Sequence, residues 1–356
     1  MSEVKPQYYD GTKLLSMKDI NGKTPELLLC TTNRTGGKTT YYNRYLINRF
    51  MKHGEKFCLS YRYNYELDNA DEKFFKDIHE LFFSNYYMSM ENMCKGKIKR
   101  LYFGTDPTDK LFMKECGYAI ALNDPDVIKK NSHFFSDVST ILLDEFQSET
   151  NNYIPNEVKN FLSIHTSIAR GQGEQRRFVR VIMLGNQVSL INPYYTSLGI
   201  SSRLSTDTKF LKGDGFVLEQ GFIETASRAQ KESGVSRAFA HEEYVKYSSE
   251  NVYLNDNYAF IDQPKGRGKY MCTIKYHGSE YGIIQYVDDG LIYCSNKADS
   301  TFPIKLAVTT DDHNINYVLL KTQAVLFMQL RYYFEKGCFR FSDLKSKEAL
   351  LTAISY

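Results

Sequence analysis

The sequence contains no tryptophan, no Cys-x-x-Cys pair and no apolar run long enough to cross a bilayer. Its seven cysteines are scattered and odd in number, which is typical neither of a disulfide framework nor of a zinc site. Free cysteines of this kind indicate a reducing compartment. No apolar segment opens the chain, so we expect neither a cleaved leader nor an association with membranes.

The sequence also has little net charge, no low-complexity tract and no internal repeat. Lysine and arginine number 45 against 42 aspartates and glutamates, a formal charge of +3. This balance excludes a histone-like DNA binder and a polybasic membrane-surface protein. It does not exclude nucleic acid as a partner, because a protein that moves along DNA should hold it weakly, through a few local cations. The length of 356 residues is enough for two domains, each with its own core.

Residues 27–40 have the order expected for a phosphate-binding loop. An apolar run predicts a strand, a small polar loop ends in Gly-Gly-Lys-Thr, and a helix is predicted over 40–53. Lys38 would reach the β- and γ-phosphates of a nucleotide, and the Thr39 hydroxyl would hold Mg²⁺. The predicted nucleotide-binding residues are Thr35, Gly36, Gly37, Lys38, Thr39 and Thr40. Thr32 departs from the usual pattern, which has a glycine there, and the alternative is a lysine that begins a surface helix.

A second motif lies at the end of another apolar run. Residues 138–143 predict a buried parallel strand that ends in the adjacent carboxylates Asp144 and Glu145. Unpaired buried charges are costly, so such a strand end favours a functional site over an ordinary acidic loop. In P-loop NTPases one acid at this position holds Mg²⁺, here Asp144, and the other orients and deprotonates the attacking water, here Glu145. Both motifs in the expected order predict an ATPase.

Other candidates follow or precede predicted strands. Arg62 comes after a strand predicted at 57–59, at the sheet edge where α/β proteins bind ligands. It would contact phosphate or DNA, or form a surface ion pair. Asn186 follows a later apolar run and would sense the γ-phosphate or hold the lytic water. Tyr8 and Tyr9 precede the first strand, where an aromatic ring would lie on adenine or pack at the domain edge.

A basic loop follows the helix predicted over 156–169. It carries Arg170, Arg176 and Arg177 and leads into a strand predicted over 178–184. An arginine on a flexible loop suits a finger that reaches a neighbouring subunit's nucleotide, where it would raise the rate about 10³- to 10⁵-fold. The alternative is a solvated basic loop.

The predicted elements divide the chain into three parts: an α/β domain at 1–220, a polar helical linker or lid at 221–257, and a small α+β domain at 258–356. In the first part, residues 95–123 predict a β insertion. Two helices carry apolar stripes that predict core positions. These are Phe74, Phe75, Ile78, Leu81 and Phe82 in helix 71–85, and Val158, Phe161, Leu162 and Ile168 in helix 156–169. In the third part, a β-meander with a turn at Asp289-Gly290 precedes a helix over 319–335.

The third part also carries the acids that a nuclease would need. A two-metal nuclease requires several carboxylates that converge on ions about 4 Å apart. The candidates are Asp262, Asp288, Asp289, Asp311 and Asp312. Asp288 and Asp289 are better explained by the turn, and the run 310–312 by a helix cap, so we predict no nuclease activity. Any DNA contact in this part would rest on Lys265, Arg267 and Lys269.

Two stretches resemble a known family. Residues 139–158, STILLDEFQSETNNYIPNEV, and 184–195, LGNQVSLINPYY, are similar to the encapsidation ATPases of phi29-like short-tailed bacteriophages, and residues 41–63 are similar too. The resemblance implies a motor that packages double-stranded DNA, with an ASCE-type P-loop domain and a vestigial RNase H-like nuclease domain. It implies a homo-oligomeric ring, a pentamer, on the portal of a prohead in the host cytoplasm. Whether a packaging RNA is a partner stays open.

The resemblance also implies roles for single residues. Arg34 matches an arginine within the loop, Lys38 and Thr39 match its lysine and hydroxyl, and ATP and Mg²⁺ are the implied ligands. Asp144 and Glu145 match the metal-side acid and the catalytic base, Asn186 the sensor, and Arg170 the finger that acts in trans. Extra residues around 171–174 leave Arg176 and Arg177 as alternatives to Arg170.

Two other functions remain as alternatives. The first is a terminase-like packaging protein with a live metal-dependent nuclease in its C-terminal part. The second is a non-catalytic nucleic-acid-binding assembly protein with a decayed P-loop, which the threonine at position 32 keeps open.

Overall fold

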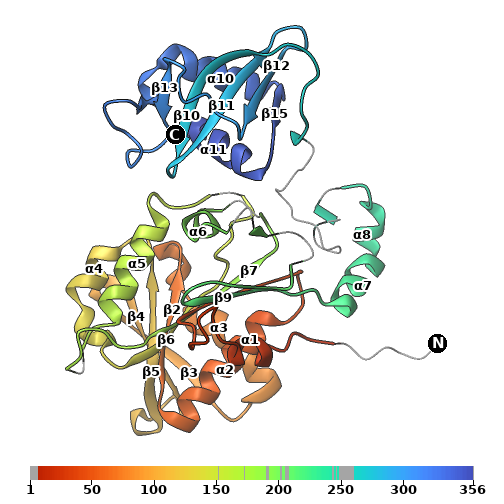
Figure 1. The fold of residues 1–356 in the computed structure, drawn as a ribbon. Helices are drawn as coiled ribbons and strands as arrows, with labels where there is room; N and C mark the ends of the chain where they lie inside the picture. The colour runs from red at the N-terminus through yellow and green to blue at the C-terminus, as the bar shows by residue number, and fades with distance from the viewer. Residues whose placement is uncertain are drawn as a thin grey trace. The chain divides into compact units, whose positions relative to one another are not determined.

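The computed structural model describes residues 7–150, 152–171, 173–189, 192–200, 203–204, 208–242, 244–245, 247 and 260–355. The chain divides into two compact units, Met1–Ser197 with Leu204–Asn255, and Leu198–Arg203 with Asp256–Tyr356 (Figure 1). Residues 221–255 of the predicted linker therefore group with the first unit, and several residues of that linker lie outside the described ranges. No helix in the described ranges is long and apolar enough to cross a bilayer.

The first unit is built on a nine-stranded sheet, which confirms the predicted α/β class. The strand order is β3-β4-β5-β2-β6-β7-β1-β9-β8. The six strands from β5 to β9 in this order run parallel, and antiparallel strands β3, β4 and β8 extend the two edges. The strands are β1 Leu27–Thr32, β2 Lys56–Tyr61, β3 Tyr87–Met93, β4 Ile98–Gly104, β5 Met113–Ala121, β6 Val138–Leu143, β7 Arg180–Asn186, β8 Phe210–Lys212 and β9 Phe216–Gln220.

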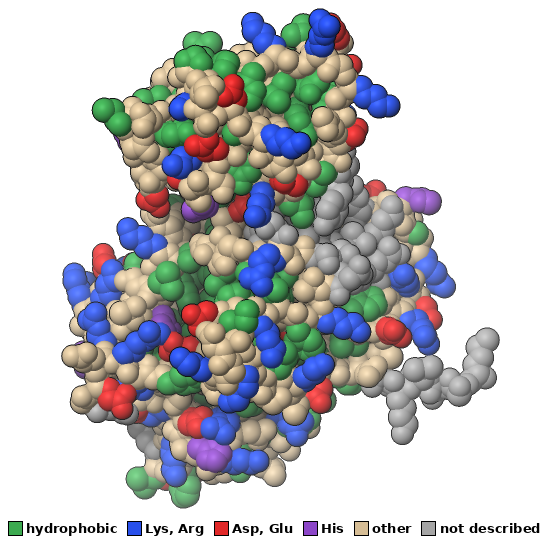
Figure 2. Space-filling model, viewed as in Figure 1, with side chains coloured by type: hydrophobic (Ala, Val, Ile, Leu, Met, Phe, Trp, Pro, Cys, Tyr) green, Lys and Arg blue, Asp and Glu red, His purple; other side chains and the backbone are tan. Residues whose placement is uncertain are grey.

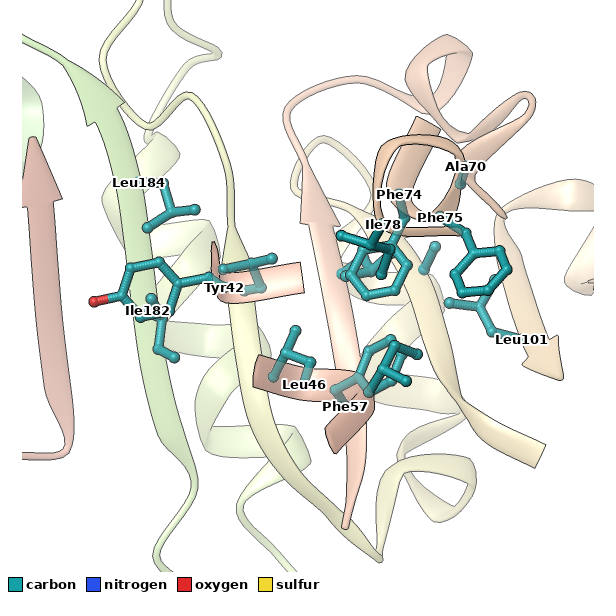
Figure 3. Packing of buried hydrophobic residues seen from close by; sticks show 14 of the residues in the cluster. Tyr42, Leu46, Phe57, Ala70, Phe74, Phe75, Ile78, Leu101, Ile182 and Leu184 are labelled. Carbon is teal, nitrogen blue, oxygen red and sulfur yellow. The ribbon is translucent and has the colours of Figure 1, made fainter. Parts of the chain in front are cut away.

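Helices cover both faces of this sheet (Figure 1). They are α1 Thr12–Ser16, α2 Lys38–His53, α3 Ala70–Phe82, α4 Pro125–Lys130, α5 Glu157–Ile168, α6 Pro193–Ser197, α7 Glu224–Glu232 and α8 Gly234–Ala238. Successive side chains of a strand face opposite layers, so alternate residues pack under α2 and α3. Figure 3 shows residues of this core, among them Tyr42 and Leu46 of α2, Phe74 and Ile78 of α3, and Phe57 of β2. The ring of Phe57 stacks on that of Phe74, with 5.1 Å between the ring centroids.

Three packing predictions for this unit are wrong. Residues 95–123 are no separate insertion, because β5 pairs in parallel with β2 inside the main sheet. Leu81 and Phe82 are exposed, since the apolar stripe of α3 leaves the core in its last turn. Leu162 is also exposed, and Ile164 of the same helix is buried instead.

The second unit contains a six-stranded mixed sheet in the order β14-β13-β10-β11-β12-β15. Its strands are β10 Lys269–Tyr276, β11 Ser279–Tyr286, β12 Leu291–Ser295, β13 Lys305–Ala307, β14 Val318–Leu319 and β15 Phe339–Phe341. Strands β10, β11 and β12 form an antiparallel meander, and β13 lies parallel to β10. Gly290, at φ +64°, turns the chain between β11 and β12 as predicted. The helix predicted from 319 begins only at Ala324, as α10 Ala324–Glu335, and α11 Leu344–Ser355 follows.

The helix cap predicted at 310–312 is wrong. No helix starts there. The buried Asp312 carboxylate instead accepts hydrogen bonds from the backbone N–H groups of His277 (2.7 Å) and Gly278 (2.8 Å), so it fastens the β10–β11 hairpin turn. Among the described residues no three or more His, Cys, Asp or Glu side chains gather where they could hold a metal ion.

Candidate active site

The phosphate-binding loop lies between the end of β1 and the start of α2, at the carboxyl edge of the parallel sheet. Thr32, which replaces the usual first glycine, is the last residue of β1 and is buried opposite Asn186 of β7. It therefore needs no special backbone conformation. The loop opens instead at Asn33, whose side chain accepts from the N–H of Ile223 (2.8 Å) and donates to the carbonyl of the same residue (3.1 Å).

Gly37 is the residue whose backbone lets the loop enter the helix. Its φ is +86°, in the left-handed region that glycine adopts without a steric penalty. A Cβ at this position would lie 3.3 Å from the ring of Tyr8, so the exposed Tyr8 packs beside the loop. Tyr9 is buried and its hydroxyl donates to Glu219 at 2.6 Å, which favours the packing role for Tyr9. Thr40, in the first turn of α2, is partly exposed.

Lys38 of the loop contacts Asn186, the polar residue at the end of β7. The Lys38 ammonium is buried and donates to Oδ1 of Asn186 at 2.7 Å. Burial lowers the pKa of Lys38, and the nearby carboxylate of Asp144 opposes that effect. A buried ammonium whose hydrogen-bond acceptor is a neutral amide oxygen would bind more strongly to a charged acceptor, such as a phosphate oxygen.

The hydroxyl residue of the loop also contacts the acidic strand end. Thr39 donates from its hydroxyl to Oδ2 of Asp144 at 3.1 Å. Burial raises the pKa of Asp144, and Lys38 acts in the opposite direction. A hydroxyl and a buried carboxylate are oxygen ligands of the kind that Mg²⁺ prefers, so Thr39 and Asp144 fit that ion.

Glu145 is exposed and directly follows Asp144. Its backbone has φ +55°, which is uncommon for a residue with a side chain, and its N–H donates to Oδ1 of Asp144 at 2.9 Å. It borders a cavity of about 320 Å³ beside the loop. The cavity is lined by Thr39, Asn43, Leu59, Ser60, Tyr61, Arg62, Glu66, Lys73, Phe74, Leu142, Asp144 and Glu145.

Sequence reasoning missed Glu149, which connects several of these residues. Its Oε1 accepts from Nε of Arg34 at 3.1 Å, from the hydroxyl of Tyr247 at 2.9 Å and from Nδ2 of Asn186 at 3.4 Å. The ion pair outweighs burial and raises the pKa of Arg34. Arg34 and Tyr247 are 115 and 98 residues away along the chain, so no local pattern signals this cluster.

The three arginines of the basic loop lie at the opposite edge of the sheet from Lys38. Arg177 donates to the carbonyl of Val138, the first residue of β6, and to two further carbonyls. Arg176 pairs with Glu26, whereas Arg170 is exposed. Helix α5, of 12 residues and therefore about 18 Å long, leads from the carboxyl edge of the sheet to this edge. An arginine placed here lies at the edge of the sheet away from the phosphate-binding loop of its own chain.

A parallel sheet, a lysine-threonine loop entering a helix, and an acidic strand end beside that loop define a P-loop NTPase fold with an ATPase-type site. The family described as Podovirus DNA encapsidation protein (Gp16) matches residues 4–352. The chain belongs to this family, as its resemblance predicted, and is a viral DNA packaging protein.

Individual relatives support the assignment to this family. The DNA packaging proteins of Bacillus phages PZA and phi29 are each 30% identical over 318 residues, which cover 89% of this chain and 87% of the relative. A solved chain of the bacteriophage phi29 viral genome packaging motor assembly is 26% identical with a TM-score of 0.63, covering 98% of this chain and 97% of that one. The Phi-28 gp11 DNA packaging motor, at 17% identity and a TM-score of 0.65, has a similar fold.

Proposed function

We propose that this chain is a ring-forming motor that hydrolyses ATP and moves double-stranded DNA into a viral prohead. The observation that carries the proposal is the meeting of Lys38, Thr39, Asp144 and Asn186 at one sheet edge. Family membership supports the packaging task, because the relatives are DNA packaging proteins.

The contacts suggest how these residues divide the work. Lys38 exchanges the Asn186 oxygen for β- and γ-phosphate oxygens of ATP. Thr39 and Asp144 would hold Mg²⁺, which would neutralise phosphate charge. Glu145 accepts the proton of a water whose oxygen attacks the γ-phosphorus as the bond to ADP breaks. Asn186, released from Lys38, is free to contact the γ-phosphate or that water.

The ring is supported by the position of Arg170. Its exposed side chain lies at the sheet edge away from its own loop, so a neighbouring subunit would complete the site by inserting it. We propose that the assembly is a pentamer, which forms on the portal of the prohead in the host cytoplasm. Whether a packaging RNA belongs to this assembly stays open. The likeness to a chain of the phi29 motor assembly supports a ring of this kind.

The second unit has a supporting role in this proposal. We propose an RNase H-like fold without nuclease activity, which the antiparallel meander β10–β12 followed by the parallel β13 supports. Basic and acidic side chains are interspersed on the face shown in Figure 2. A surface of that kind fits a weak, movable grip on DNA.

Packaging itself tests the proposal. Full-length protein, purified proheads, linear double-stranded DNA and Mg-ATP are incubated together, and the DNA protected from added nuclease is measured. We expect protected DNA with the wild type and none with Lys38→Ala. Metal-dependent nicking that disappears when Asp262 or Asp312 is replaced would instead favour a live nuclease, and tight ATP binding without turnover would favour a non-catalytic assembly protein.

A further inference from the structure

Three segments that are far apart in the sequence meet around one side chain, Arg62. Arg62 follows β2, within the run YRY at 61–63. The run at 152–158 contributes Tyr153, Ile154 and Glu157, and the Asn-Pro-Tyr-Tyr run at 192–195 contributes Tyr194. None of these residues belongs to the phosphate-binding loop or to the acidic strand end, and the proposed function gives them no task.

The guanidinium of Arg62 is committed to three acceptors. Nε donates to Oε2 of Glu157 at 2.9 Å. Nη2 donates to the backbone carbonyls of Glu145 (3.1 Å) and Phe146 (3.0 Å). The ring of Tyr153 lies under the guanidinium, with its centroid 5.1 Å from Cζ. With 12% of its side chain exposed, Arg62 forms a buried ion pair with Glu157 rather than the surface ion pair that the sequence suggested.

Glu157 holds the arginine in place because its own carboxylate is fixed. Its side chain is 1% exposed. Oε1 accepts from the hydroxyl of Tyr194 at 2.9 Å, and Oε2 accepts from the N–H of Ile154 at 3.0 Å. A buried carboxylate with this many donors has one orientation, and the arginine paired with it has one as well.

The two carbonyls that Arg62 holds belong to the turn that carries Glu145. This turn has the positive φ of Glu145, a conformation that persists only where neighbouring groups impose it. The N–H of Phe146 donates to the carbonyl of Leu184 at 3.0 Å, which fixes the turn to β7. Arg62 fixes the same turn from the side of β2, and it borders the cavity next to Glu145.

We propose that Arg62 is a positioning residue for ATP hydrolysis: with Glu157 and Tyr194 it forms a buried brace that holds the Glu145 turn and aims the Glu145 carboxylate at the attacking water. This inference rests on the proposed function, in which Glu145 is the base. It also assigns a task to the runs at 152–158 and 192–195, which lie within the stretches that resemble the family.

Arg62→Lys tests the brace with little risk to folding. A lysine keeps the charge beside Glu157, but its single nitrogen cannot reach the carboxylate and both carbonyls in one plane. We expect kcat for ATP to fall about 10- to 100-fold, as a misplaced catalytic group does. KM, and the affinity for a fluorescent ATP analogue, should stay within about twofold, because Nε and Nη2 of Arg62 already donate to protein acceptors. The affinity for ADP with aluminium fluoride, which mimics the transition state, should fall with kcat.

Lys56 offers a matched control on the same two strands. It begins β2 and pairs with Glu115 (2.6 Å) and with Asp137 (2.7 Å), the residue before β6. Lys56 therefore connects β2 to β6 at the ends of these strands that lie away from Arg62. Lys56→Met and Arg62→Met both remove a cation that bridges β2 to β6. We expect both to lower the melting temperature, and only Arg62→Met to lose turnover per folded molecule.

Three outcomes would overturn the proposal. Equal kcat for Arg62→Lys and wild type would show that the brace does not position Glu145. A loss of ATP-analogue affinity as large as the loss of kcat would make Arg62 a phosphate contact. A wild type without any ATP turnover would refute both the proposed function and the brace. In the first two outcomes the wild type hydrolyses ATP and only the brace is refuted.

Discussion

Replacing Glu157 with alanine should destabilise the first unit strongly. The substitution removes a carboxylate that is 1% exposed and leaves the guanidinium of Arg62 buried without its counter-ion. It also leaves the hydroxyl of Tyr194 and the N–H of Ile154 without their acceptor. Breaking a buried pair from one side costs about 3–5 kcal/mol. For a unit of this size, each kcal/mol corresponds to roughly 2–4 °C, so the melting temperature should fall by about 6–20 °C.

Scanning calorimetry of the full chain measures this shift. The matched control is Asp126→Ala, which breaks the exposed pair between Lys129 and Asp126 of the first unit, where the side chains are 43% and 82% exposed. An exposed pair is worth about 0–1 kcal/mol, so the control should melt within a few degrees of the wild type. A fall of less than about 2 °C for Glu157→Ala would refute the claim that this pair is buried and structurally required.

Three further predictions follow from the contacts. Lys38→Ala should lose most affinity for ATP while keeping its melting temperature, measured with a fluorescent analogue; unchanged affinity would remove Lys38 from the site. Arg170→Ala should bind ATP normally and hydrolyse it slowly, and mixed rings with Glu145→Gln subunits should regain turnover if Arg170 acts in trans; no recovery in rings shown to be mixed would reject that role. Burial alone would raise the pKa of Glu115, but the hydrogen bonds from Lys56 and Tyr118, together with the nearby charges of Lys56 and Arg100, outweigh it and lower that pKa. The Glu115 carboxylate therefore stabilises the folded state above the pKa that a glutamate has in the unfolded chain, and this stabilisation is lost as the pH falls through the lower folded pKa. Glu115→Gln should flatten the dependence of the melting temperature on pH in acid. A pH profile that matches the wild type would contradict this.

The local parts of the site could be predicted from the sequence. Lys38 and Thr39 lie in a short pattern between a strand and a helix, and Asp144 ends an unbroken apolar run. Parallel strands bring their carboxyl ends to one edge, so the meeting of these residues follows from topology. Asn186 was found for the same reason, as the polar end of the neighbouring strand β7.

The long-range contacts could not be predicted. Glu149 joins Arg34 and Tyr247, and Glu157 joins Arg62 and Tyr194, across distances in sequence that no periodic pattern encodes. Apolar spacing also failed at helix ends, where Leu81 continues the stripe of α3 but has no sheet beneath it. The place of β5 was missed because a strand that pairs antiparallel with the strand before it in sequence, β4, can still pair in parallel with a more distant strand, here β2.

The most direct measurement is steady-state ATP hydrolysis by wild type and Glu145→Gln, side by side, with Mg²⁺ and with and without double-stranded DNA. The account predicts turnover by the wild type, and a Glu145→Gln protein that binds ATP with unchanged affinity but does not hydrolyse it. Equal turnover by the two proteins would contradict the role of Glu145 and, with it, the site built around Lys38, Thr39 and Asp144.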